Sequence, residues 1–583
     1  QHNHFLEHFY CYTRRIMSAN PDNAKTIKQP QQIENIAPLA IGDQKLTRHL
    51  GYFSGTMMNI GQIIGTGIFS NPALIIQNCG SGGMMLVLWV VGAIFASTGV
   101  WSYLELGTML PRSGGEKEYL AYEFPRPKHL ISFVFLITTG VFSRGSGIAQ
   151  GATVFGSNII YAIGGPTYTN DWGARGFAAF CITFWVVLNI LSSKSCCFKL
   201  AIRFNNFFTV LKILLLLLLI CVGFAGLAGR LPNRPDLAEN FSFNGTSNNS
   251  GNYANGIYYV IFAYGGWYNL NYVIDELKDP IKNLPRCAIT ALSSTTVLYL
   301  LANVAYLAVL PVSVIANSKL TVAANLFDTA FGGVFGGRVL PVFVGLSSFG
   351  FVGVVTYSGS RVILETARQG YLPFDRTFSK VHPKLQTPIY SLLLIYVISL
   401  IFLLAPPPGY VFQFIVAFSG YGGYLFAALS VIGLLILRRT QPDLKRPIKV
   451  PIVVALIFIV ICIYTLVFVW IPPSKPPTAY PYYLPYVISI ALVAVSVVLW
   501  VSIVRLELLF LTTGSRYHFS ISKWSEMKDW NAHTMPKLLQ PDRKNYLMTF
   551  TKTIRAHHPP QMSALSKKNS QTRILIRSKL EKE

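Results

Sequence analysis

Runs of about twenty apolar residues recur along most of this 583-residue chain, and each run is long enough to cross the hydrocarbon core of a bilayer as a helix. Only 13% of the residues are charged, about half the share of a soluble domain. The pattern excludes an ordinary soluble protein and predicts an all-α polytopic membrane protein with about 12 transmembrane helices. The predicted spans are 52–77, 84–110, 130–162, 175–192, 204–228, 255–277, 287–310, 338–362, 389–405, 410–437, 450–471 and 484–510.

The predicted organisation has three parts: a polar N-terminal tail at 1–50, a transmembrane domain at 51–510 and a basic C-terminal tail at 511–583. Residues 1–50 contain no apolar segment of the signal-peptide type, so the first span is expected to serve as the membrane signal. Connectors rich in Lys and Arg alternate with connectors poor in them. By the positive-inside rule, both tails are predicted to be cytosolic.

The formal net charge of +25 does not indicate a nucleic-acid partner. The basic residues lie at the ends of apolar runs and in the last stretch, without the aromatic interleaving of a nucleic-acid surface. The eight cysteines form no CxxC pair and have no histidine at metal-binding spacing, so neither a disulfide framework, nor a metal site, nor a cofactor is predicted. No HExxH, GxSxG or nucleotide-binding motif is present, which argues against an enzyme.

Three N-x-S/T sequons begin at Asn240, Asn244 and Asn248, all in the polar loop after the fifth run. Single sequons are common by chance, whereas three in one loop suggest glycosylation and hence an extracellular position. That position agrees with a cytosolic N-terminus, because an odd number of spans precedes the loop.

Glycine interrupts the first and the sixth run, at Gly65-Thr66-Gly67 and at Gly265-Gly266. Each glycine costs a helix up to about 1 kcal/mol, and backbone freed from a helix at this depth survives only where it is buried or lines a cavity. Breaks at these two positions predict a LeuT-like 5+5 inverted repeat with broken helices 1 and 6 and a substrate site at their shared midplane. The alternative is that the glycines only permit close helix packing.

A midplane site of this kind suits an amino acid. The N-terminal end of a half-helix attracts a carboxylate, and freed carbonyl oxygens accept an ammonium. We therefore expect Gly65, Thr66 and Gly67 to hold the α-carboxylate, and the carbonyls around Phe262 and Ala263 to hold the α-ammonium. Gly265 is expected to resist replacement by a β-branched residue, because its backbone must follow the break.

Several motifs resemble those of the L-type amino acid transporters of the APC superfamily, over about residues 50 to 510. The sixth run carries Phe-Ala-Tyr-Gly-Gly-Trp and the first carries Ile-Gly-Thr-Gly-Ile-Phe, and the loop after the second run reads Pro-Arg-Ser-Gly-Gly-Glu-Lys, which looks most like the fungal branch with its high-affinity methionine permeases. These motifs stand at 262–267, 64–69 and 111–117, with further similarity at 276–285, 360–373 and 382–388.

The resemblance implies roles for further residues. Phe262, or its neighbour Trp267, would act as a gate, and Phe418 and Tyr421 match positions that surround the substrate side chain, although aromatic residues in membrane helices more often pack or face lipid. Animal members of the family read Trp-Asn-Tyr where this chain has Trp267-Tyr268-Asn269, so side-chain selectivity does not transfer directly. The loop at 163–174 lacks the cysteine that bonds animal relatives to a glycoprotein, so no disulfide-linked heavy chain is predicted.

Lys212 lies about nine residues, or roughly 13 Å, beyond Arg203 at the cytosolic end of the fifth run. A lysine stem snorkels over only part of that distance, and an intramembrane charge indicates function by default. In the related sodium-independent transporters a lysine at this position takes the place of a sodium ion. The resemblance thus implies transport without sodium, and a buried lysine leaves a proton-coupled cycle open.

Two further charges lie in predicted spans, and each has two interpretations. Arg144 either pairs with helix carbonyls or faces the permeation path, and Glu105 forms either a helix-end ion pair or part of a proton relay.

The expected function is secondary active transport of L-amino acids across the plasma membrane by alternating access. The expected substrates are amino acids with neutral side chains, such as methionine. The expected partners are the amino acid, the lipid bilayer and, in a coupled cycle, protons. The alternative from another class is a non-transporting amino-acid receptor on the same fold.

Overall fold

The computed structural model describes residues 50–513 except 128, 169, 192–196, 232–234, 369–370, 373, 383–384, 386 and 475. Side chains at 197–206, 275 and 503–513 are also left out of the description. The described residues all fall within one compact unit of the chain. The predicted tails at 1–50 and 511–583 lie outside the described residues, apart from Leu50 and the backbone of 511–513.

The described part of the chain is helical, and its only β-type pairing is an isolated bridge between Leu50 and Leu277. Its first half contains α2 (Tyr52–Ile63), α3 (Gly67–Cys79), α4 (Gly82–Met109), α5 (Glu116–Glu123), α6 (Leu130–Phe135), η3 (Leu136–Ser143), α7 (Arg144–Gly164), α8 (Asp171–Leu191), α9 (Cys197–Leu227), α10 (Leu237–Asn240) and α11 (Ser250–Ala263). Its second half contains η4 (Asn269–Tyr272), η5 (Ile274–Glu276), α12 (Pro280–Val309), α13 (Val312–Asn317), α14 (Val322–Phe331), η6 (Phe335–Val339), α15 (Leu340–Arg368), α16 (Asp375–Phe378), α17 (Ile389–Leu404), α18 (Val411–Thr440), α19 (Ile452–Phe468) and α20 (Leu484–Thr513).

Among the described residues, eight helical segments are long and apolar enough to cross a membrane, and α17 and α19 are shorter apolar helices. Each of these ten segments coincides with one of the predicted spans. The remaining two predicted spans, the first and the sixth, are divided: α2 and α3 share the first, and α11 followed by turns occupies the sixth. The helical breaks thus fall within the first and the sixth predicted spans.

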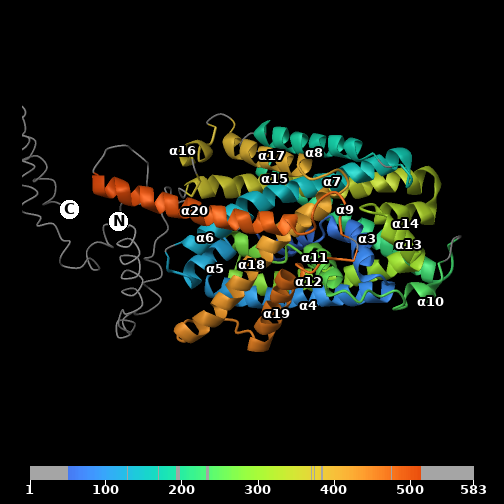
Figure 1. The fold of residues 1–583 in the computed structure, drawn as a ribbon, viewed down its shortest axis with the longest axis horizontal. Helices are drawn as coiled ribbons and strands as arrows, with labels where there is room; N and C mark the ends of the chain where they lie inside the picture. The colour runs from blue at the N-terminus through green and yellow to red at the C-terminus, as the bar shows by residue number, and fades with distance from the viewer. Residues whose placement is uncertain are drawn as a thin grey trace, which may run out of the picture. The chain divides into compact units, whose positions relative to one another are not determined.

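The helices pack in a way that surrounds the two broken segments (Figure 1). The long helices α7 and α15 lie side by side with α8 next to them, while α12 packs on α2, α4 and α9. Between these groups, α11 packs against α3. The two interrupted segments consequently contact each other although about 190 residues separate them along the chain.

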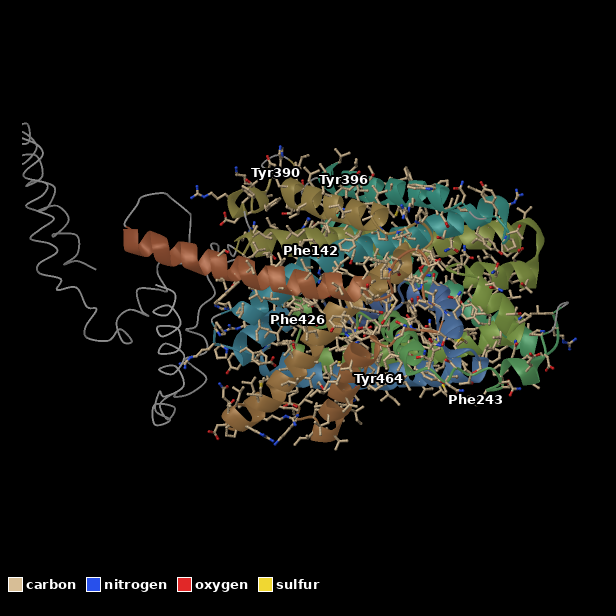
Figure 2. The ribbon with its side chains drawn as sticks, in the orientation of Figure 1. Phe142, Phe243, Tyr390, Tyr396, Phe426 and Tyr464 are labelled. Carbon is tan, nitrogen blue, oxygen red and sulfur yellow. The ribbon has the colours of Figure 1, made fainter. Side chains whose placement is uncertain are left out.

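The outward faces of the bundle are apolar, as a lipid environment requires. Phe180 of α8, Val460 of α19 and Val498 of α20 are each more than half exposed. In Figure 2 the labelled Tyr390 lies at the margin of the bundle on α17. Fully buried aromatic side chains, among them Trp89, Tyr264 and Tyr299, occupy the interior instead.

The short helix α5 connects the second span to the third and carries two buried carboxyl groups. Glu116 accepts hydrogen bonds from the hydroxyls of Tyr103, at 3.2 Å, and Tyr272. Glu123 lies against Gly433 of α18, and both of its oxygens are buried without a hydrogen-bond partner. Burial raises the pKa of the Glu123 carboxyl well above its usual value.

The raised pKa of Glu123 predicts a pH-dependent stability. The folded state keeps a proton that the unfolded state releases, so stability is expected to fall as the pH rises above the usual carboxyl pKa of about 4.3. Replacing Glu123→Gln should raise the melting temperature of the detergent-solubilised protein by a few degrees at pH 7.5, with little change at pH 4.5. Glu118→Gln, on the same helix but paired with Lys117 and partly exposed, is the control; equal shifts in both variants would contradict the prediction.

Candidate functional site

The first break leaves a helix start without a side-chain cap. Helix α2 ends at Ile63, and α3 begins at Gly67 after Thr66, whose side chain makes no capping hydrogen bond. Thr66 is 1% exposed, and its hydroxyl has no hydrogen-bond partner. The first N–H groups of a helix have no partner within the helix and carry its positive dipole end. The buried start of α3 is therefore suited to bind an anionic group.

The second break follows the end of α11 at Ala263. The N–H of Gly265 bonds the carbonyl of Phe262 at 3.0 Å, and the N–H of Asn269 bonds the carbonyl of Gly266 at 3.0 Å, so tight turns replace the helix. Gly266 has φ +97°, a left-handed conformation that favours glycine. A Cβ there would also lie 2.6 Å from Cγ of Gln62 in α2. The left-handed conformation is thus found at Gly266 and not at Gly265. A Cβ on Gly265 would still lie 3.0 Å from the carbonyl oxygen of Phe262, so the expected constraint at Gly265 stays a prediction.

The two breaks touch each other directly. A Cβ on Gly67 would lie 2.7 Å from Cα of Ala263, so the start of α3 and the end of α11 meet with no room for a side chain. Next to this contact, Asn71 Nδ2 donates to the carbonyl of Tyr259 at 2.6 Å. Six of the predicted substrate-binding residues are brought together at this junction: Gly65, Thr66, Gly67, Phe262, Ala263 and Gly265.

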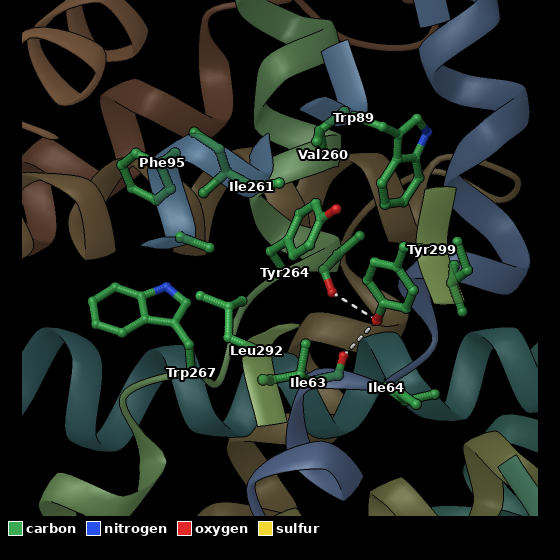
Figure 3. Packing of buried hydrophobic residues seen from close by; sticks show 14 of the residues in the cluster. Ile63, Ile64, Trp89, Phe95, Val260, Ile261, Tyr264, Trp267, Leu292 and Tyr299 are labelled. Atoms are coloured by element: carbon green, nitrogen blue, oxygen red, sulfur yellow. Dashed lines mark hydrogen bonds between the residues drawn. The ribbon is translucent and has the colours of Figure 1, made fainter. Parts of the chain in front are cut away.

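A tyrosine on α12 joins both broken ends, and no sequence motif pointed to it. The hydroxyl of Tyr299 lies 2.8 Å from the carbonyl oxygen of Ile63 and 3.0 Å from that of Ala263, the last residues of α2 and α11 (Figure 3). Its single proton donates to one carbonyl at a time. The ring is fully buried between Trp89 and Tyr264, at centroid distances of 5.4 and 5.1 Å. The only available sequence signal is that a tyrosine inside an apolar run needs a polar partner.

Lys212 connects three helices beside the first break. Its Nζ donates to the carbonyl of Gly61 in α2 at 3.3 Å and lies 5.7 Å from the ring centroid of Phe351 in α15. The side chain is 3% exposed. The ammonium thus lies between the first and the eighth predicted spans. The edge of the Phe351 ring lies 3.8 Å from the position of a Cβ on Gly65, which places the charge one ring away from the break.

Comparison with known proteins identifies the family. A model of the amino acid permease family matches residues 50–496, more than half of the chain. The chain belongs to the amino acid permease family. It is accordingly a multi-pass membrane protein of an amino-acid-transporter family within the APC superfamily, and not an enzyme.

Relatives of known name lie at about 30% identity to this permease. The high-affinity methionine permease of Saccharomyces cerevisiae is 32% identical over 62% of the chain, and the match spans 61% of that relative's length. The b(0,+)-type amino acid transporter 1 of Mus musculus is 30% identical over 70% of the chain and 79% of the relative. The large neutral amino acids transporter small subunit 2 of Homo sapiens is 31% identical over 70% of the chain and 73% of the relative.

The two predicted gate residues of the permease have different surroundings. Phe262 is half-buried, 6.1 Å from the ring of Phe412 in α18, and packs against a small cluster that includes Val154 and Leu320. The ring of Trp267 is buried on the side of α4 instead, where a Cβ on Gly99 would meet it at 2.6 Å. Figure 3 shows Trp267 apart from the Tyr299 bridge. Of the two, Phe262 remains next to the junction of the breaks.

The residues predicted less firmly on α18 contact other helices. Phe418 pairs with Phe402 of α17 at a centroid distance of 4.9 Å. Tyr421 pairs with Trp470 and Tyr486 at 6.2 and 5.8 Å. None of these ring contacts connects Phe418 or Tyr421 to the breaks, and their role around a substrate stays a prediction.

The two ambiguous charges of the sequence have identifiable partners. Glu105 is paired with Arg438, and Arg446 lies 3.6 Å from it; the backbone N–H of Val450 also donates to its carboxylate at 2.8 Å. The helix-end ion pair is therefore confirmed for Glu105. Arg144 follows the π-helical turn η3, donates to Ser358 at 3.4 Å and stacks over the ring of Tyr272 at 5.4 Å. It thus links α7 to α15 and to the segment after the second break.

The Tyr299 bridge predicts a specific mutational effect. Tyr299→Phe removes the hydroxyl that joins the two broken ends. The buried carbonyl of Ala263 loses this donor, at a cost of about 1–3 kcal/mol, while the carbonyl of Ile63 keeps the N–H of Gly65 at 2.7 Å. Uptake of amino acid is expected to fall about tenfold while the protein still reaches the membrane. Tyr306→Phe is the matched control, because Tyr306 is equally buried on α12 but donates only within the first broken span, to Ile68 at 3.2 Å. Equal losses in the two variants would refute a special role for Tyr299.

Proposed function

We propose that this permease is a secondary active transporter of neutral L-amino acids that works by alternating access. The observation that carries the proposal is the buried, uncapped start of α3 in contact with the end of α11. A helix start supplies N–H donors for a carboxylate, and a helix end supplies carbonyl acceptors for an ammonium. Both groups of an amino acid are attached to one carbon, and the two helix ends meet closely enough to bind them together.

In this proposal the α-carboxylate binds the backbone at Gly65 to Gly67 through the N–H groups of Thr66 and Gly67, assisted by the hydroxyl of Thr66. The N–H of Gly65 donates to the carbonyl of Ile63 at 2.7 Å in this structure and holds the turn that presents the other two. The α-ammonium binds carbonyl oxygens at Phe262 and Ala263. Phe262 closes the site as a gate, since it lies beside the junction and is only half-buried. The first ten of the twelve predicted spans form the 5+5 inverted repeat, and movement of its two halves around the broken segments exposes the site to each side in turn.

The substrate class is supported by the names of the relatives. Two of them are described as a methionine permease and a large neutral amino acids transporter subunit. We therefore place neutral side chains first, with methionine among them. Since the match spans 61% of the methionine permease, the substrate of that protein is a guide and not an assignment.

We further propose that the permease lies in the plasma membrane with both termini in the cytosol and without a disulfide-linked heavy chain. The loop with the sequons would then be extracellular, and Phe243 in that loop lies at the end of the bundle that carries α10 (Figure 2). Asn244 and Asn248 are exposed and suited to carry glycans. Asn240 is less suited, because its Nδ2 donates to the carbonyls of Leu307 and Leu310 and its side chain is buried.

Uptake measurements test the proposed function. A host strain that lacks its own amino-acid permeases should accumulate radiolabelled methionine or leucine when it expresses this chain, and unlabelled neutral amino acids should compete. Gly266→Ala should abolish the uptake, because a Cβ at this position has no room beside Gln62. Gly147→Ala is the control and should still reach the membrane, because no atom of the described residues lies within 4 Å of the new Cβ. Binding of amino acids without flux would favour the receptor interpretation instead.

The position of Lys212 predicts transport without sodium. If its ammonium holds α2 near α15 as a bound cation would, replacing external sodium with choline should leave initial uptake unchanged. Lys212→Ala should lower uptake at least tenfold, and Lys212→Arg should restore little, because a planar guanidinium does not replace a compact ammonium. Lys278→Ala, an exposed lysine, serves as the control. Sodium-dependent uptake together with a fully active Lys212→Ala variant would contradict this role.

A further inference from the structure

One face of α7 is directed toward the two breaks. Residues 147, 150, 151 and 154 lie within about 100° of each other on a helix with 3.6 residues per turn. A Cβ on Gly151 would lie 2.8 Å from the ring of Phe351, the same ring that approaches Gly65 of the first break. No atom lies within 4 Å of the position of a Cβ on Gly147, so this part of the face borders open space.

The next residue along the same face contacts the second break. Val154 is buried in a cluster with Leu74 of α3 and Phe412 and Val416 of α18, and Phe262 packs against that cluster. This face of α7 therefore lies against the ring of Phe351, which separates it from Gly65 of the first break, and Val154 belongs to the cluster against which the gate residue Phe262 packs. Gln150 lies on this face, between Gly147 and Val154.

Gln150 is fully buried, and neither its amide nitrogen nor its amide oxygen has a hydrogen-bond partner among the described residues. Leaving one buried polar group unpaired costs about 1–3 kcal/mol, and here both groups of one side chain are unpaired. Asn158, two turns further along α7, is also buried, but only its Oδ1 is unpaired among the described residues, because its Nδ2 donates to the carbonyl of Val154 at 2.9 Å. An amide left without a local partner beside a transport site is suited to pair with the transported molecule.

We propose that Gln150 recognises the side chain of the substrate and, among the neutral amino acids that the permease accepts, favours those whose side chain ends in a hydrogen-bonding group. This inference rests on the proposed function, because it assumes that the junction of the breaks is the substrate site. The amide of Gln150 offers a donor and an acceptor together. A carboxamide or a hydroxyl can satisfy both, whereas a carboxylate only accepts and an ammonium only donates.

Gln150 is therefore expected to disfavour side chains with charged ends and side chains with purely apolar ends. Charged ends leave one of the two amide atoms unpaired, and purely apolar ends leave both unpaired. A site built to hydrogen-bond a substrate group rejects the analogue that lacks it far more strongly than an apolar pocket rejects an added hydroxyl. Glutamine is accordingly expected to bind better than norleucine, which has a side chain of similar length without polar atoms.

Competition against radiolabelled methionine uptake tests this selection. In the unaltered permease, glutamine is expected to inhibit at a concentration at least tenfold lower than norleucine does. In Gln150→Met, which keeps the length of the side chain and removes both polar atoms, this preference should disappear or reverse, while norleucine still inhibits. Asn158→Leu, a buried amide on the same helix that already has a partner, should keep the preference for glutamine.

Two results would overturn the inference: stronger inhibition by norleucine in the unaltered permease, or an unchanged preference in Gln150→Met. Thermal unfolding of the purified full chain supplies a second measurement that needs no flux, since glutamine should raise the melting temperature more than norleucine does. Failure of uptake with this stabilisation intact would count against the proposed transport function alone. Absence of stabilisation by glutamine, with stabilisation by norleucine, would count against the role of Gln150.

Discussion

The structure depends on how it satisfies backbone polar groups that two broken helices release inside a membrane. Hydrocarbon offers no hydrogen bonds, so such groups must find partners within the protein. Tyr299 supplies a donor for the carbonyl ends of α2 and α11, and Asn71 supplies one for Tyr259 beside them. The start of α3 receives no side-chain cap. This uncapped helix start is the part of the junction that offers backbone N–H donors to an anion.

Close contact between backbones makes this arrangement possible. Gly67 permits the start of α3 to reach Ala263, and Gly266 permits the second break to reach Gln62 of α2. Because both glycines lie in the breaks themselves, the same residues that interrupt the helices also allow them to meet. Close packing of backbones is therefore found at the same place as the helix breaks.

Three charged side chains, Lys212, Arg144 and Glu105, have partners on other segments of the bundle. Lys212 bonds α2 and lies beside α15, and Arg144 reaches α15 and the segment after the second break. Glu105 is paired with Arg438 in the last turn of α18 and lies near Arg446, which follows that helix. The contacts of Lys212 and Arg144 connect the broken segments to α15. A movement of α15 relative to the broken segments must therefore change the partners of these two charged side chains.

The sequence by itself determined the membrane spans, the two breaks, the mid-membrane lysine and the family, because apolar run length, glycine position and motifs are local properties of a chain. Only the tertiary structure decided which side chains serve the junction. Tyr299 lies more than 230 residues from Ile63, and the rings of Phe262 and Trp267, five residues apart, turn to different helices. The difference between Gly265 and Gly266 is one of backbone conformation, and the unpaired amide of Gln150 follows from what surrounds it. Periodicity tells which face of a helix a residue occupies, but the neighbour on that face is set by packing between distant segments.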